Sequence, residues 1–285
     1  MRLLAVALAV TLLAQQPAAD DVDFLCPMDK DIRTKQPGKC PRCGMKLVAG
    51  IADPLEYPVL LTLAPRAPRP GAAFDLTLRV EDPKTHSIVT KFELVHEKLF
   101  HLFLVSEDLQ YFAHEHPEPH PNGDFLFRTV LPKAGPYRVA ADFYPAGGTP
   151  QMHVSTMYVR GTPPPHAPLQ ANLLPQPGVN LRAELITEPP EPLAGFKTLL
   201  FVQLKPIHGA EFQLEPYLGA WGHMLAASED LIDLIHTHPF IADGGAKVQF
   251  NMIFPRVGIY RVWMQFQNQG ELNTVAFNIP VKQLR

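Results

Sequence analysis

All three cysteines of this 285-residue chain, Cys26, Cys40 and Cys43, lie in one short stretch near its start. Two residues separate Cys40 from Cys43 and a glycine follows, which is the spacing of a tight turn that presents two thiolates to one metal ion. Met28 and Met45 each stand two residues after a cysteine. Thiolates with thioethers favour Cu(I) or Ag(I), whereas thiolates alone also suit zinc. The pattern therefore predicts a soft-metal site. The alternatives are a Cys40–Cys43 disulfide and methionines that only fill a small core.

The residues around these cysteines read C-P-M-D and then P-G-K-C-P-R-C-G-M-K-L. This pattern resembles the short heavy-metal-binding domain of bacterial copper and silver efflux proteins and of some metal-transporting P-type ATPases. The resemblance implies metal contact through the three cysteines and the two methionines, and a metal-efflux protein as partner. The family usually has histidine where this chain has Asp29. Because a carboxylate is a harder ligand than imidazole, Asp29 either favours zinc over Cu(I) or leaves the site with three ligands.

Histidine is the second candidate ligand, and eight of the 12 histidines recur when the chain is shifted by 122 residues. The recurring pairs are His86 with His208, His101 with His223, His114 with His236, and His116 with His238. Alternate residues of a strand lie on one face, so the two rings of each H-x-H motif project together. We expect the three rings at 101, 114 and 116, and those at 223, 236 and 238, to converge on a zinc- or copper-sized ion in each copy.

The strand pairing decides whether the rings meet. With a four-residue hairpin loop from Ser106 to Leu109, residue 101 lies opposite residue 114. The alternative is structural, with each ring bonded to a backbone carbonyl. His96, His120 and His166 are predicted to be solvated loop residues.

The elements that position these residues are predicted to be strands. The repeat also aligns S-E-D-L at 106–109 with 228–231, and G-x-Y-R at 135–138 with 258–261. Alternating apolar residues, frequent turns and 31 prolines favour short strands over helices. The predicted fold is mainly β: a small Cys-rich N-terminal metal-binding module followed by two tandem immunoglobulin-like β-sandwich repeats. The tyrosine of each G-x-Y-R segment is expected to bond back to the chain.

Five segments follow from this organisation. Residues 1–19 have the short positive start and the apolar run of a secretory signal peptide, which predicts a periplasmic or secreted protein. The predicted metal-binding module is 20–52, the sandwiches are 57–161 and 180–285, and a proline-rich linker occupies 162–179.

Composition excludes several functions. A formal net charge of −3 argues against nucleic-acid binding, and 46% hydrophobic residues argue against a disordered chain. Common catalytic motifs are absent, so we expect no enzyme. No later segment predicts stable membrane insertion. The predicted function is capture, buffering or transfer of a heavy metal, copper first and zinc second. The alternatives are an extracytoplasmic interaction or adhesion protein with a zinc-stabilised module, and a three-histidine metalloenzyme.

Overall fold

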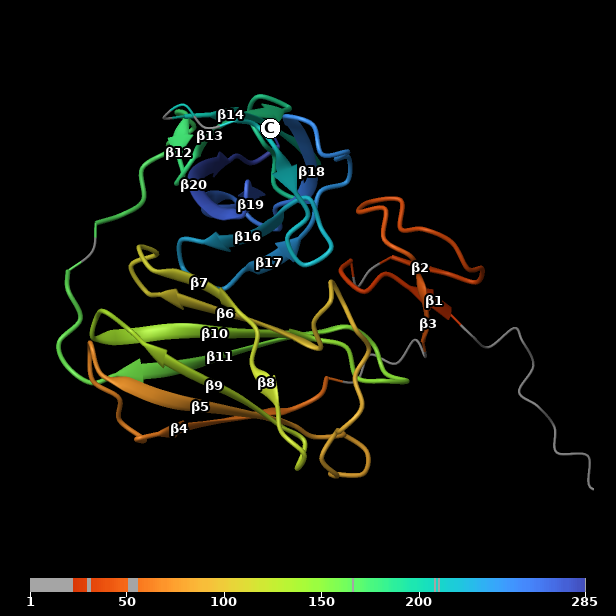
Figure 1. The fold of residues 1–285 in the computed structure, drawn as a ribbon, viewed down its shortest axis with the longest axis vertical. Coiled ribbons are helices and arrows are strands. Elements are labelled where there is room, and N and C mark those ends of the chain that lie inside the picture. Colours follow the sequence, from red (N-terminus) through yellow and green to blue (C-terminus); the bar gives the residue numbers. More distant parts are fainter. Residues whose placement is uncertain are drawn as a thin grey trace, which may run out of the picture.

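The computed structural model describes residues 23–29, 32–50, 56–165, 167–207, 209 and 211–284. These residues form strands and loops with no helix, arranged as a small N-terminal module beside two larger β-sandwiches (Figure 1). The predicted fold class is confirmed. The predicted signal peptide lies outside the described residues. No helix long and apolar enough to cross a membrane occurs in the part of the chain that is described.

The N-terminal module is a three-stranded antiparallel sheet in the order β2-β1-β3. Its strands are β1 (Asp23–Leu25), β2 (Arg33–Thr34) and β3 (Val48–Gly50). The connections between the strands are longer than the strands themselves, and they carry all three cysteines. The sheet thus holds the β1–β2 loop close to the β2–β3 loop.

The first sandwich has two four-stranded antiparallel sheets. One sheet, in the order β4-β5-β9-β8, consists of β4 (Val59–Ala64), β5 (Ala73–Val80), β9 (Asp124–Val130) and β8 (Glu118–Pro119). The other, in the order β11-β10-β6-β7, consists of β11 (Gln151–Val159), β10 (Gly135–Phe143), β6 (Phe100–Ser106) and β7 (Phe112–Glu115).

The second sandwich repeats this arrangement. Its first sheet has the order β12-β13-β14-β18, with β12 (Gln176–Pro177), β13 (Leu181–Glu188), β14 (Lys197–Pro206) and β18 (Lys247–Ile253). Its second sheet pairs β15 (Leu214–Glu215), β19 (Gly258–Asn268), β16 (His223–Ser228) and β17 (Leu234–Thr237), with β20 (Glu271–Val281) also on β19. Strands β16, β17 and β19 occupy the places of β6, β7 and β10.

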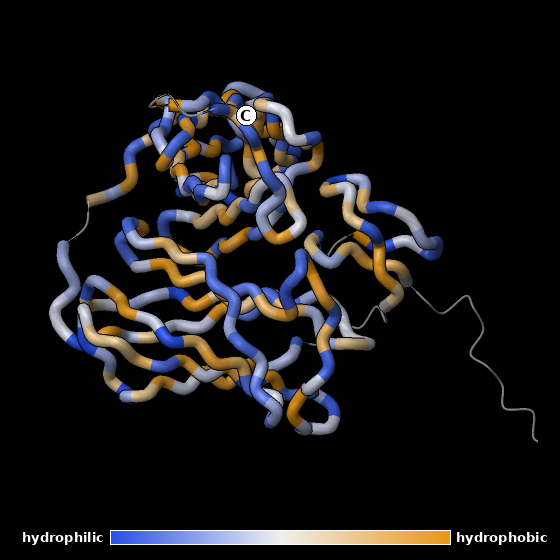
Figure 2. Tube along the Cα trace, in the orientation of Figure 1, coloured by the Kyte–Doolittle hydropathy of each residue, from blue (hydrophilic) through white to orange (hydrophobic). Residues whose placement is uncertain are grey.

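Alternation along the strands builds each core. On β5, Phe74, Leu76, Leu78 and Val80 are buried, while the residues between them are half-buried. Figure 2 shows apolar and polar segments following one another along the strands of the first sandwich. Each sheet therefore presents one apolar face to its partner sheet, as in other sandwiches.

Strands β6 and β16 depart from alternation, because every residue in them is buried. Leu102 and Leu104 face the core of their own sandwich, whereas Phe103 and Val105 pack in a separate cluster with Leu225 of the second sandwich. The β6–β7 and β16–β17 hairpins thus lie against each other between the sandwiches (Figure 1). A strand buried on both faces is typically a continuous apolar run, and β6 fits this apart from His101 and Ser106.

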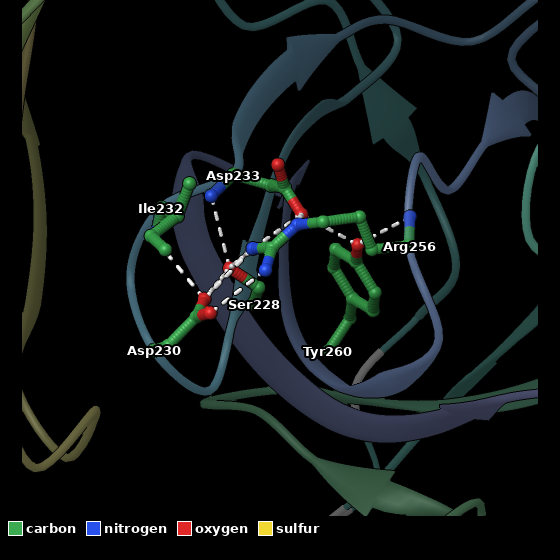
Figure 3. Close-up of polar contacts among 6 residues, drawn as sticks. All are labelled: Ser228, Asp230, Ile232, Asp233, Arg256 and Tyr260. Carbon is green, nitrogen blue, oxygen red and sulfur yellow. Dashed lines mark hydrogen bonds and ion pairs between the residues drawn. The ribbon is translucent and has the colours of Figure 1, made fainter.

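The predicted tyrosine bonds are confirmed in both sandwiches. The Tyr137 hydroxyl donates to the Lys133 carbonyl at 3.1 Å. The Tyr260 hydroxyl accepts from the Arg256 backbone N–H at 3.2 Å and donates to the Asp233 carboxylate at 2.7 Å. The Arg256 guanidinium also holds Asp233 and Asp230, which lie in the β16–β17 loop (Figure 3). This network fixes the turn of the β16–β17 hairpin, whose second strand carries His236.

Replacement of Tyr260 by phenylalanine is expected to lower the free energy of unfolding by about 1–3 kcal/mol, since it removes both hydrogen bonds of a hydroxyl in a partly buried network. Urea denaturation monitored by tryptophan fluorescence measures the change. Tyr158→Phe is the control, because the Tyr158 hydroxyl bonds the Gly161 carbonyl on an exposed ring. Equal effects of the two substitutions would contradict a structural role specific to Tyr260.

Candidate metal centres

The N-terminal module brings its three cysteines and one aspartate to a common point. Cys26 and Asp29 come from the loop after β1, and Cys40 and Cys43 come from the turn before β3. One ligand atom from each of the four lies within 4.8 Å of every other. The Cys26 and Cys43 sulfurs are 3.3 Å apart, and the Cys40 sulfur is 3.2 Å from Asp29 Oδ2. We call these four residues the thiolate centre.

The thiolate centre is buried and reduced. Cys26, Cys40 and Cys43 are 0, 2 and 6% exposed, and Asp29 is 8% exposed. All three cysteines are free, so the alternative of a Cys40–Cys43 disulfide does not describe this structure. Three sulfurs and one oxygen within reach of one point match the ligand number of a tetrahedral zinc site.

Asp29 is fixed as the fourth member by its two oxygens. Oδ1 accepts from the Arg42 guanidinium at 3.1 Å, whereas Oδ2 faces the sulfurs of Cys26 and Cys40. Of the two outcomes expected for Asp29, the structure places its carboxylate with the thiols and does not leave a three-residue set.

The pKa values of the three thiols in the thiolate centre are shifted in different directions. Hydrogen bonds from Cys26 and Cys43 lower the pKa of the Cys40 thiol to about 2. The bond to Cys40 in turn raises the pKa of Cys26 to about 12, and bonds to Cys26 and Cys40 raise that of Cys43. Burial, followed by the neighbouring Cys40, raises the pKa of Asp29. Negative charge is therefore crowded here, and a cation would relieve the repulsion.

The two methionines predicted as ligands take different positions. Met28 is 9% exposed and belongs to the same buried cluster as the cysteines. Met45 is half-buried, and its sulfur lies 2.9 Å from Nε2 of His96 in the first sandwich.

The module is docked on both sandwiches. Val95 and Tyr144 of the first sandwich complete its buried cluster. In the second sandwich, the Asn251 side-chain amide donates to the Arg42 carbonyl at 3.1 Å. Burial raises the pKa of Tyr144 to about 12, consistent with a ring enclosed by this contact.

The predicted register of the histidine hairpin is wrong by two residues. The four-residue loop is Glu107–Gln110 and not Ser106–Leu109, because the Ser106 N–H donates to the Tyr111 carbonyl at 3.1 Å. Phe103 therefore pairs with His114, which places His101 opposite His116. Because the observed register differs from the predicted one by an even number of residues, all three rings still lie on one face of the sheet.

The predicted convergence of His101, His114 and His116 is confirmed, but the prediction of a separate site in each copy is wrong, because rings from both sandwiches meet between them. Ligand atoms of His101, His114 and His116 lie within 4.8 Å of one another. A second group at the same spacing joins His114 of the first sandwich to His223 and His236 of the second. The third ring of the second copy, His238, contacts His223 at 2.7 Å through Nε2 and Nδ1. We call the six rings the histidine centre.

In four of the six rings, one nitrogen is hydrogen-bonded to an acceptor oxygen outside the histidine centre. Nε2 of His101 bonds the Val95 carbonyl at 2.9 Å, and Nε2 of His223 bonds the equivalent carbonyl, that of Tyr217, at 2.8 Å.

The other two supports cross between the sandwiches. Nδ1 of His114 bonds Gln265 Oε1 of the second copy, and Nδ1 of His236 bonds Asp142 Oδ2 of the first, both at 2.8 Å. Asp142 and Gln265 occupy equivalent positions on β10 and β19, opposite His101 and His223.

Burial keeps these rings neutral. It is the main cause that lowers the pKa of His101, His114, His223, His236 and His238, and it lowers that of His116 to about 3. Neutral imidazole is the form that binds metal ions.

His96 was predicted to be solvated, and this is wrong. Its ring stacks on His238 with centroids 3.7 Å apart, and burial lowers its pKa to about 4. It occupies a two-residue turn with a φ of 47°, where the second copy has Leu218 at 50°. Two-residue hairpin turns require this left-handed backbone, so the turn carries the ring towards the module.

Two further histidines among the described residues are exposed. His120 is exposed as predicted and bonds Asn122. His86 is exposed, whereas its repeat partner His208 and also His166 lie outside the described residues. The residues missed by sequence reasoning are His96, Asp142 and Gln265. The last two could have been found as polar residues at equivalent positions of apolar strands.

Comparisons with known proteins agree with the resemblance of the module. Residues 24–49 match the heavy metal binding domain family. No curated protein matches the chain.

Among solved structures, the chain is similar to the Escherichia coli adhesin FdeC, with 13% identity, a TM-score of 0.27, and coverage of 84% of this chain and 71% of the other. For the adhesin InvE of Yersinia pseudotuberculosis the identity is 12% and the TM-score 0.26, with coverage of 79% and 60%. An ice-binding adhesin of an Antarctic bacterium gives 6% and 0.23, with coverage of 81% and 49%. At these TM-scores the likeness says nothing about function.

A second family matches both sandwiches, at residues 56–161 and 192–283, and it is described as a domain of unknown function (DUF8832). These residues are more than half of the chain, and the chain therefore belongs to that family.

Proposed function

We propose that this protein captures and buffers a soft heavy-metal ion at the thiolate centre and hands it to a partner. The observation that carries the proposal is the convergence of Cys26, Cys40, Cys43 and Asp29 within 4.8 Å, with all three thiols free. We propose a binding role and not catalysis.

Copper(I) is the proposed cargo and zinc the second choice. Thiolates suit both ions, but thioethers favour copper, and Met28 lies in the buried cluster with the cysteines. Asp29 argues in the other direction, because an oxygen ligand suits zinc better. A copper(I) ion would use the three sulfurs, whereas zinc would also take the Asp29 carboxylate.

The proposed setting is the periplasm or the extracellular space, and the proposed partner is a metal-efflux protein. The apolar run near the start supports export, and the heavy-metal-binding match supports the partner. Transfer would proceed by ligand exchange at the sulfurs.

A second candidate function is an interaction or adhesion protein whose module is a structural zinc cap. The low exposure of the four ligands favours it, since structural sites are closed. The two functions differ in the rate at which a competing chelator removes the ion. A transfer site should empty within seconds to minutes and leave the chain folded, whereas a structural site should release the ion slowly, together with unfolding of the module.

Replacing Cys26, Cys40 and Cys43 together by serine is expected to lower bound copper(I) by one equivalent per chain, because the serine hydroxyl is a poor ligand for a soft ion. Copper is supplied under reducing conditions, and elemental analysis follows desalting. His120→Ala, an exposed ring outside both centres, should leave the count unchanged. An unaltered count in the serine variant would overturn the proposal.

Asp29→Asn separates the two ions. Zinc affinity is expected to fall by about tenfold or more, because a charged ligand becomes a neutral amide, while copper(I) affinity changes little. Competition with chromophoric chelators measures both. Asp75→Asn, which removes an exposed carboxylate paired with Arg128, is the matched control. Equal loss of both affinities would contradict a sulfur-only copper site.

Metal binding is expected to release about two protons at neutral pH. Cys40 already binds as a thiolate because of its low pKa, whereas Cys26 and Cys43 keep their protons until the ion displaces them. Affinity should therefore fall as pH falls. Titration calorimetry in buffers of different ionisation enthalpy counts the protons, and a count near zero would show that all three thiols are already ionised.

A further inference from the structure

We propose that the histidine centre is a metal site of its own, built jointly by the two sandwiches, and that it holds one divalent ion of the kind that prefers imidazole, Zn²⁺ or Cu²⁺. The proposal does not depend on the thiolate centre, since none of its ligands comes from the module.

The four hydrogen-bond acceptors described above determine which nitrogen of each ring carries a proton. A carbonyl, an amide oxygen and a carboxylate can only accept hydrogen bonds, so the nitrogen that faces each of them carries the ring's single proton. Gln265 presents its oxygen to His114 Nδ1 at 2.8 Å, and its amide nitrogen donates to Thr274 Oγ1 at 3.2 Å. The opposite nitrogen of each ring therefore presents a lone pair to the centre.

Two of these lone pairs face each other directly. Nδ1 of His101 and Nε2 of His114 are 3.1 Å apart. Their other nitrogens donate to Val95 and Gln265, so neither atom has a proton to offer. Nδ1 of His101 also lies 3.2 Å from Nε2 of His116. Ligands around one tetrahedral ion lie roughly 3.3 Å apart when the metal–nitrogen bonds are about 2.0 Å, so a cation between these rings fits the spacing.

Other nitrogens lack a hydrogen-bond partner altogether. Among the described residues, Nε2 of His236 and Nδ1 of His238 are buried without one. Their residues are 4 and 2% exposed. A buried polar atom without a partner is costly. The free nitrogen of His236 is the one opposite Nδ1, which bonds Asp142, and His236 belongs to the group with His114 and His223.

His114 fixes the number of ions. It belongs to both groups of three, yet its Nδ1 is bonded to Gln265, so only Nε2 is left to bind an ion. One nitrogen binds one ion, so a single ion takes His114 as the common ligand, with rings from both sandwiches around it. The Asp142 carboxylate behind His236 offsets part of the positive charge, as carboxylates behind metal-bound histidines do elsewhere.

The test uses the full chain with Cys26, Cys40 and Cys43 replaced by serine, so that the thiolate centre contributes nothing. This protein is expected to bind one equivalent of Zn²⁺ or Cu²⁺. With Cu²⁺, electron paramagnetic resonance should show hyperfine splitting from several ring nitrogens. Absence of binding in this background would overturn the proposal without affecting the proposed role of the thiols.

Substitutions then identify the ligands. In the same background, His114→Ala with His236→Ala is expected to abolish binding, and Asp142→Asn to weaken it by about 10–100-fold. His120→Ala is the control. Because the double variant removes rings from the interface, circular dichroism must show that it is folded. His116→Ala, which removes a half-buried ring, is the second variant, and it is expected to weaken binding. The ion should raise the melting temperature of the parent but not of the double variant. Unchanged affinity in a folded double variant would assign the rings a purely structural role.

Discussion

The packing of the β6–β7 hairpin against the β16–β17 hairpin is the contact on which the rest of the molecule depends. Phe103, Val105, Leu225 and Trp263 form its apolar part, and burying side chains of this size contributes about 1.5–3 kcal/mol each. The same face of β6 that carries Phe103 and Val105 carries His101. Apolar contact thus sets the distance between the two sandwiches at a value that lets imidazoles from both touch.

The interface joins three units and not two. The module rests on Val95 and Tyr144 of one sandwich and bonds Asn251 of the other. Met45 contacts His96, and His96 stacks on His238. The thiolate centre and the histidine centre are therefore neighbours connected by two side chains, although their ligands differ in softness, with sulfur in one and nitrogen in the other.

The sequence was sufficient where the signal is local. The alternation on β5 predicts a strand, and the C-P-R-C turn predicts two thiols at one point, since both depend on neighbouring residues. Residue 101 was placed opposite 114 because nothing local shows that the loop starts at Glu107. The meeting of the two histidine triplets depends on packing between copies, for which the only sequence signal is the apolar run at 102–105 in β6. His96 was misjudged for the same reason, because its neighbours come from the module and from the second sandwich.

The exchange of supports between the copies has a consequence for how this chain can change over time. Asp142 orients a histidine of the other copy, and Gln265 does the same in return. After duplication, two such domains are ordinarily free to drift apart. Here a substitution of Asp142 in one copy removes the hydrogen-bond acceptor of His236 in the other. Neither copy can therefore change its side of the histidine centre independently. Away from it the halves are free to differ, as they do where β8 pairs with β9 in the first sandwich and β12 pairs with β13 in the second.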